Sequence, residues 1–170
     1  MAELTPQERL QPALLDRLTD DEPDKTVEAR ERRVLSMRKL RESVLRDIAW
    51  LLNTGNLEQL EDLSDFPDVI RSTLNYGMRD LSGLTLSQAK LSELEKVVRR
   101  AILDFEPRVI PSTLKVRAHG ATEQMSHHAL SLQIEGDLWA HPVPLHLLLR
   151  SEIDLESGAM NVTEAGESRG

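Results

Sequence analysis

The stretch LSELEKVVRRAILDFEPRVIPSTLKV, residues 91–116, changes its hydrophobic period in the middle. Up to Phe105 the apolar residues recur every three or four positions, which predicts an amphipathic helix. Pro107 ends that helix, because proline has no backbone donor and disfavours helix at the residue before it. Beyond it, Leu114 and Val116 alternate with charged residues, which is typical of a half-buried strand. The chain therefore passes from helix to sheet at this corner.

Helical patterns precede the corner. A long amphipathic helix is predicted from Ser36, with Gly55 as the left-handed residue that ends it. A shorter helix is predicted over residues 67–74, with Gly77 at its end. The helix that leads to the corner is expected to begin near Thr85, which has the spacing of an N-terminal capping box.

Strand patterns follow the corner. Apolar and polar residues alternate over residues 130–135, 145–150 and 153–156. No strand–helix–strand alternation occurs, which argues against a doubly wound nucleotide-binding fold. The sequence predicts an α+β fold, with N-terminal helices packed on one face of a small, mainly antiparallel C-terminal sheet.

The two ends of the chain differ in composition from its middle. Residues 1–33 are predicted to form an N-terminal docking segment and a charged flexible linker, followed by a domain over residues 34–158 and a disordered tail over 159–170. Leu14, Leu15 and Leu18 share one face of a helix that is too short to be stable alone. That face is therefore expected to dock, either on the body of the same protein or on a partner.

Composition argues against several classes of protein. The 21 basic and 29 acidic residues give a net charge of −8, which is unfavourable for holding a nucleic-acid backbone. The absence of cysteine removes disulfide scaffolds, cysteine-bound metals and thiol catalysis. No apolar stretch approaches the length of a membrane span, and the first residues are acidic rather than typical of a signal peptide. We expect a cytoplasmic protein that does not bind nucleic acid or insert in the membrane.

Few patterns suggest chemistry. No phosphate-binding glycine loop or nucleophile elbow is present. His127 and His128 are neighbours, so on a strand they would point to opposite faces, and no metal or cofactor site is predicted. Carboxylate pairs for acid–base catalysis can be drawn in three places, although solvated surface acids are the simpler interpretation: Asp104 with Glu106, Glu135 with Asp137, and Glu152 with Asp154.

The triplet Glu106-Pro107-Arg108 stands at the helix-to-strand corner. Pro107 favours an extended conformation at Glu106, and residues two apart in an extended chain project to the same side. The carboxylate and the guanidinium therefore leave the helix end together. Such a pair is either an internal clasp that closes the corner or a paired polar hook for another protein, and the residues alone leave both open.

Several short motifs occur in an order that resembles a known family. They are LLDRLTDD (14–21), LRESVLRDIAWLLNT (40–54), YG (76–77), FEPR (105–108), IEGDLWA (134–140), PVP (142–144) and RSEIDLESG (150–158). Each is weak alone, but their combination resembles the TssE family of type VI secretion baseplate subunits. That family belongs to the lysozyme-like wedge proteins of contractile phage tails.

The resemblance implies a structural subunit rather than an enzyme. Such subunits join TssF and TssG in a baseplate wedge, with TssK more peripheral, beneath the inner-membrane complex in the cytoplasm. The TssB/TssC sheath starts on this ring, and the tube protein Hcp is a further candidate partner. The alternatives are a peptidoglycan-cleaving lysozyme-like enzyme and a cytosolic adaptor unrelated to secretion.

The resemblance also assigns a role to the corner. It implies that Glu106, Pro107 and Arg108 contact the wedge core and take part in sheath initiation. An open strand edge of the sheet would template the first sheath layer by strand addition. Reversing the charge of Glu106 or Arg108 is then expected to leave the isolated protein folded and to prevent sheath assembly.

Overall fold

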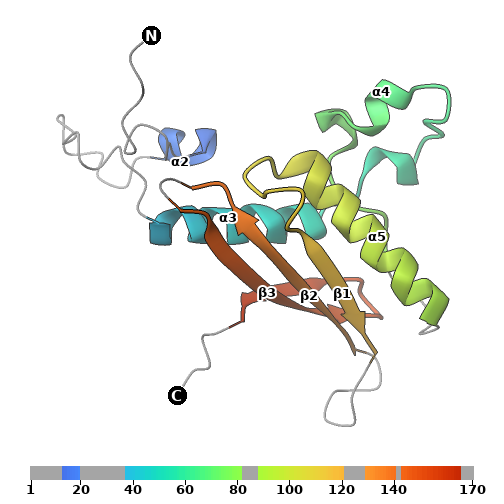
Figure 1. The fold of residues 1–170 in the computed structure, drawn as a ribbon. Helices are drawn as coiled ribbons and strands as arrows, with labels where there is room; N and C mark the ends of the chain where they lie inside the picture. Colours follow the sequence, from blue (N-terminus) through green and yellow to red (C-terminus); the bar gives the residue numbers. More distant parts are fainter. Residues whose placement is uncertain (1–12, 20–36, 82–87, 121–128, 141–142, 166–170) are drawn as a thin grey trace.

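The computed structural model describes residues 13–19, 37–81, 88–120, 129–140 and 143–165 (Figure 1). Its elements in chain order are α2 (Leu14–Leu18), α3 (Met37–Leu52), the 3-10 turn η2 (Leu57–Gln59), α4 (Pro67–Ile70), the 3-10 turn η3 (Thr73–Asn75), α5 (Gln88–Phe105), β1 (Lys115–His119), β2 (Ala129–Leu138), β3 (Leu145–Asp154) and β4 (Met160–Glu164). Helices come first and a sheet follows, so the predicted α+β class is confirmed.

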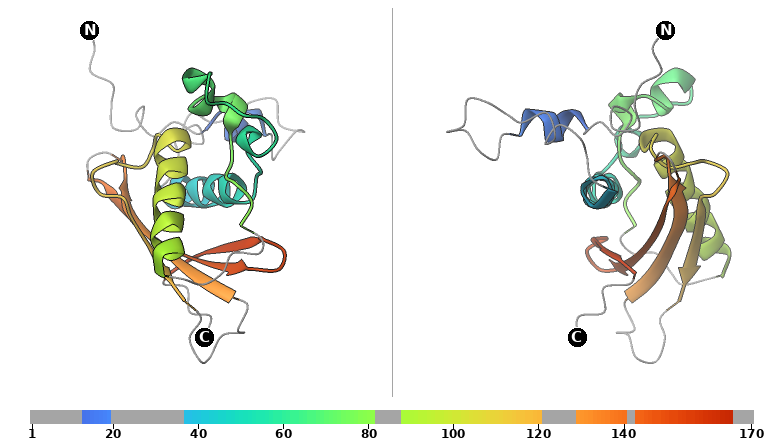
Figure 2. Two further views of the ribbon diagram at one scale, coloured as in Figure 1. Left: turned by 90° about the vertical axis from the view of Figure 1, so that its right-hand side faces the viewer. Right: turned by 60° about the vertical axis from the view of Figure 1, so that its left-hand side comes forward.

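The sheet is an antiparallel meander in the order β1-β2-β3-β4. Its register places Ile134 of β2 opposite Val116 of β1 and Leu149 of β3. Helix α5 packs on β1, α3 packs on β3 and β4, and the two helices contact each other. Figures 1 and 2 show the short α4 segment beside the C-terminal end of α5, away from the sheet.

One hydrophobic core lies between the sheet and the two long helices. Alternate residues of β2, among them Leu130, Leu132 and Ile134, are almost fully buried, as the period of two predicts. They pack in one cluster with residues of α3 and α5 such as Ile48 and Val98. Burying each such side chain stabilises the fold by about 1.5–3 kcal/mol, so the core fixes the orientation of both helices on the sheet.

The C-terminal boundary predicted from the sequence is wrong. A disordered tail was expected from residue 159, but β4 pairs with β3 over Met160–Glu164, and Met160 is buried. Gly158, at a φ of 72°, forms the turn that brings the chain back. The strand escaped detection because its apolar positions are too few to show a period. Residues 166–170 lie outside the described residues.

The predicted end of the short helix also needs correction. Helix α4 ends at Ile70 rather than at residue 74, and η3 follows it. Gly77 has a φ of 119°, and a side chain there would overlap the backbone of Thr54, so this glycine permits a close approach of two segments. Met78 donates to the Thr54 carbonyl at 2.8 Å just beyond it.

The end of the long helix differs from the prediction as well. Helix α3 spans Met37–Leu52, but Gly55 is not among the described residues with a positive φ. It instead forms a parallel bridge with Met78. The predicted Thr85 cap lies outside the described residues, and so does the predicted linker over residues 19–33 apart from Thr19. None of the described helices is long and apolar enough to cross a membrane.

Replacing Gly77 by alanine tests the close approach. Gly77→Ala should lower the free energy of unfolding by about 2 kcal/mol or more, because the methyl group meets Thr54 and the φ is left-handed. Urea denaturation followed by circular dichroism measures the change. Gly120→Ala is the matched control, since a Cβ at Gly120 meets no atom within 4 Å. Equal stability of the two variants would contradict this account.

Candidate protein-interaction site

The corner after α5 is fixed on the end of β2. Glu106 continues the helical bonding by donating its N–H to the Ile102 carbonyl at 2.8 Å, and Pro107 is exposed. The Arg108 carbonyl then accepts the N–H of Trp139 at 2.7 Å. The chain leaves the helix already hydrogen-bonded to the sheet, so the corner has little freedom to move.

Glu106 and Arg108 bind each other across this corner. The Glu106 Oε1 atom accepts from the Arg108 backbone N–H at 3.1 Å and from its Nε at 2.6 Å, while Oε2 accepts from Nη2 at 2.5 Å. Glu106 is only 4% exposed. A buried carboxylate with a two-pronged guanidinium partner is a stable, directional pair. In the described structure the pair therefore forms an internal clasp.

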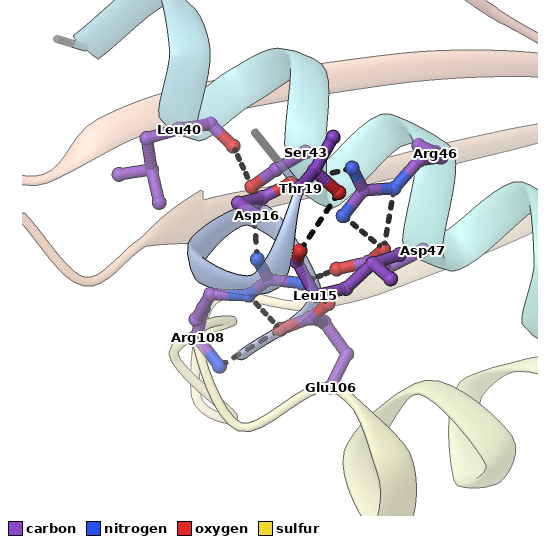
Figure 3. Close-up of polar contacts among 9 residues, drawn as sticks. All are labelled: Leu15, Asp16, Thr19, Leu40, Ser43, Arg46, Asp47, Glu106 and Arg108. Carbon is purple, nitrogen blue, oxygen red and sulfur yellow. Dashed lines mark hydrogen bonds and ion pairs between the residues drawn. The ribbon is translucent and has the colours of Figure 1, made fainter. Parts of the chain in front are cut away.

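Arg108 also binds α3 (Figure 3). Its Nη1 donates to the Ser43 hydroxyl at 3.0 Å and its Nη2 donates to Asp47 at 2.5 Å. Burial by itself lowers the pKa of Arg108, but the hydrogen bonds and charges of Glu106 and Asp47 outweigh it, so the pKa lies above its ordinary value. The guanidinium is thus a permanent cation that joins the corner to α3.

Tyr76 lies close to the same charges. Burial raises the pKa of Tyr76, and the negative charges of Asp47 and Glu106 add to the effect. The ring packs edge-on against Phe105, with ring centres 5.3 Å apart. An aromatic pair therefore backs the clasp at the residue where α5 ends.

The charged network continues to α2. Asp47 accepts from Arg46 Nη2 at 2.9 Å, and Arg46 Nη1 donates to Asp16 of α2 at 2.5 Å. The Arg46 guanidinium also lies 5.3 Å from the centre of the Trp50 ring. The hydrogen bond with Asp16 raises the pKa of Arg46, although burial opposes the shift. Negative and positive groups therefore alternate from α2 to the corner, in the order Asp16, Arg46, Asp47, Arg108 and Glu106.

The leucine side chains of α2 are exposed to different extents. Leu14, Leu15 and Leu18 are 70%, 42% and 73% exposed. Helix α2 is held on α3 by a polar contact, while its leucines are open to solvent. The sequence left open whether these leucines dock on the protein's own body or on a partner. The described residues leave Leu14 and Leu18 largely exposed and Leu15 partly exposed. Their docking on a partner stays a prediction.

The carboxylates of the three pairs considered from the sequence are mostly held by structural partners. Asp104 pairs with Arg71 at 3.2 Å and with Arg100 at 3.5 Å. On the strands, Glu135 meets Lys115, Asp137 meets His146, and Asp154 accepts the N–H of Glu156. Asp104, Glu135, Asp137 and Asp154 thus each have a structural partner.

A cleft of about 530 Å³ lies between α5 and residues 56–79. Asp104 and Phe105 line it together with Asn75, Met78 and Arg100, but Glu106 does not. Glu106, which is buried, is therefore not part of this cleft. Among the described residues no group of three or more His, Asp or Glu side chains is placed to hold a metal ion; His127, His128 and His141 lie outside the described residues.

Sequence reasoning found the corner but missed its partners on α3. Ser43 and Asp47 lie four residues apart, on the helix face that meets Arg108. A signal was present, because Asp47 is an acidic residue beside the buried Ile48 in a helix whose charges are mostly basic. What it pairs with depends on which residue of a distant segment reaches it, and the sequence does not show this.

Comparison with known proteins places the chain in a family. The family model of the baseplate wedge protein gp25 matches residues 38–143, which is more than half of the chain and includes both α3 and the corner. The chain belongs to the gp25 family of baseplate wedge proteins. The resemblance to a TssE-like wedge protein, drawn from the sequence motifs, is thereby confirmed at the level of the wedge family.

The other comparisons add little about the wedge protein. No curated protein sequence matches it closely enough to count as a relative. A solved chain from Geobacter sulfurreducens, named as a tail lysozyme, is 20% identical with a TM-score of 0.46, over 79% of the wedge protein and 97% of that chain.

Burial changes what is expected of variants at the clasp. Charge reversal at Glu106 or Arg108 was expected to leave the isolated protein folded, but Glu106 is buried and Arg108 joins two elements. A reversed charge would place two like charges together in the interior, so the fold itself should suffer. That expectation is therefore replaced by one about stability.

We predict that Arg108→Ala lowers the free energy of unfolding by about 3 kcal/mol, because Glu106 then remains buried without its cation. Adding Glu106→Gln should recover part of the loss, since an amide carries no buried charge. Denaturant titration of both variants measures this, with Arg38→Ala as the control because its pair with Glu42 is exposed and should matter by less than about 0.5 kcal/mol. A loss at Arg108 no larger than at Arg38 would show that the clasp does not hold the corner.

Proposed function

We propose that this wedge protein is a TssE-type baseplate subunit of a type VI secretion machine, which joins TssF and TssG and provides the platform on which the TssB/TssC sheath begins. The observation that carries the proposal is the corner of Glu106, Pro107 and Arg108, bound to α3 within the segment that matches the wedge family. A contractile tail needs a baseplate with a defined shape. The network supplies that rigidity between the helices and the sheet.

The surface beside the clasp is what a partner would contact. Glu106 is buried, so it positions the corner rather than reaching outward. Pro107 is exposed, and Trp139, whose N–H binds the Arg108 carbonyl, is 52% exposed. A proline and a tryptophan on a rigid backbone lose little conformational entropy on binding, which suits a protein interface. In this proposal the clasp holds Pro107 and Trp139 in place for TssF or TssG.

Helix α2 supplies a second contact in this proposal. Exposed leucines on a short helix that a polar contact ties to α3 remain available to an apolar groove on another protein. We assign Leu14, Leu15 and Leu18 to docking in the wedge, in the cytoplasm beneath the inner-membrane complex. TssK and the tube protein Hcp remain more distant partners of the same assembly.

The sheet would serve the sheath through a strand edge. The sheet has two edge strands, β1 and β4. Backbone groups that point away from the neighbouring strand can pair with an extended segment of another chain. Such pairing involves no chemical reaction. It would fix the position of the first sheath subunits.

The way in which the carboxylates near the corner are paired agrees with a non-catalytic role. Glycoside hydrolysis needs two carboxyl groups across one cleft, one of them poised to give up a proton. Asp104 and Glu106 are both paired with arginine, and of the two Asp104 alone lines the cleft beside α5. Release of soluble sugars from peptidoglycan by the purified protein would overturn the non-catalytic role and favour the lysozyme-like alternative.

Co-expression with TssF and TssG tests the proposal. The wild-type chain should co-purify with both, and Leu14→Glu/Leu18→Glu should lose at least tenfold of the captured TssF and TssG, because charged side chains do not enter an apolar groove. Leu60→Glu is the matched control, since Leu60 is 82% exposed and lies directly after η2, away from α2 (Figure 1). Thermal unfolding should show that all variants are folded.

The outcomes separate the two parts of the proposal. If the wild type fails to co-purify with TssF and TssG, an adaptor role outside secretion is favoured and the proposed function falls. If the wild type and the α2 variant co-purify equally well, the leucines are not the docking surface.

A further inference from the structure

Alternate residues of β4 turn their backbone groups outward. Ala165 donates to the Leu148 carbonyl, and the Ala159 carbonyl accepts from Asp154, so these residues of the returning chain face β3. In an antiparallel ladder the orientation alternates. The N–H and C=O groups of Met160, Val162 and Glu164 therefore point away from β3, along the edge of the sheet.

Asn53, just after the end of α3, occupies the outward groups of Met160. Its Oδ1 accepts the Met160 N–H at 2.9 Å, and its Nδ2 donates to the Met160 carbonyl at 2.8 Å. The same Nδ2 donates to the Ala49 carbonyl at 2.8 Å, in the last turn of the helix. The carboxamide therefore bonds Met160 as a neighbouring strand would, and the helix end holds it in that position.

The rest of the β4 edge is open among the residues that the structure describes. No described group bonds the outward N–H or C=O of Val162 or Glu164. The side chain of Glu164 pairs with Arg41 and leaves its backbone groups aside. Asn53 closes one end of the edge, while the other end remains able to accept a strand.

β4 is the edge of this sheet that could pair with a second copy of itself. On β1, Lys115 and Arg117 are exposed, and like charges would meet in a symmetric pair. Glu95 also accepts the outward N–H of Ala118 at 2.9 Å. β4 has the sequence MNVTE, with one charged residue and two residues that favour strands. The single charge on β4 therefore does little to prevent the edge from pairing with a second copy.

A two-fold pairing of β4 with β4 would centre on Val162. An antiparallel pair of identical strands then places Met160 of one copy opposite Glu164 of the other, at both ends of the contact. Because Asn53 occupies Met160 in each copy, both outer pairs are blocked and only the central one remains. A strand of different sequence, displaced toward Glu164, does not meet this obstacle.

We propose that Asn53 prevents the wedge protein from pairing with a second copy of itself through β4, while it leaves the Glu164 end of that edge open to a strand from another protein. The proposal goes beyond the assembly role above, since it concerns self-association of the isolated chain. Asn53 acts here as a specificity residue for the edge.

Sedimentation velocity over a concentration series tests the proposal. The wild type should remain a monomer, whereas Asn53→Ala should move reversibly towards twice the monomer mass as its concentration rises. Asn75→Ala is the control, because the Asn75 carboxamide also bonds backbone groups through both its oxygen and its nitrogen, those of Glu58 and Ile70, away from either sheet edge. It should lose stability and remain a monomer.

A second substitution shows which edge associates. Val162→Pro removes an outward N–H without breaking a bond to β3, so Asn53→Ala/Val162→Pro should return to the monomer. If Asn53→Ala fails to fold, Asn53→Asp is tested in its place. The aspartate keeps the acceptor for the Met160 N–H but frees the Met160 carbonyl. It should still associate, at a higher concentration than is expected for the alanine variant. A folded Asn53 variant that stays monomeric at every concentration overturns the proposal. Association that Val162→Pro does not reverse, or that Asn75→Ala shares, overturns it as well.

Discussion

The fold depends on one cation that is shared between two carboxylates. Arg108 binds Glu106 across the corner and Asp47 on α3, so a single side chain ties the end of α5, the start of the sheet and the long helix together. Burial makes this arrangement demanding, because each buried charge is costly without its partner. Neighbouring groups add further hydrogen bonds to these charges: Ser43 accepts one from Arg108, and Arg46 donates one to Asp47.

Rigidity at the corner fits the work of a wedge protein. A platform for assembly must present its contacts at fixed angles, and the corner is held by the sheet through Trp139 and by α3 through Arg108. A catalytic carboxyl must in addition reach a substrate in a cleft, so that it can exchange a proton with it. The carboxylate of Glu106 is instead bound to Arg108, so the Glu-Pro-Arg triplet has a structural role at the corner.

The edges of the sheet carry the second constraint. A sheet that offers backbone groups to another protein also offers them to its own copies. In the described structure two side chains bond outward backbone groups at these edges, Glu95 of α5 at β1 and Asn53, just after α3, at β4. The helices that build the core thus also limit what the sheet can bind.

Local sequence determined the elements, because each depends on neighbours in the chain. The period of three to four predicted α3 and α5, the period of two predicted β1, β2 and most of β3, and Pro107 marked the corner between them. β4 escaped because Met160 and Val162 are too few apolar positions to show a period, and Gly77 was assigned to a helix end because its true neighbour, Thr54, is distant in the chain. The clasp could be named from the sequence as a pair, but its buried state and its partners Ser43 and Asp47 could not. Those were decided by the packing of α3 against α5 and the sheet, since the partner of a buried charge is whichever group the tertiary fold brings within hydrogen-bonding distance.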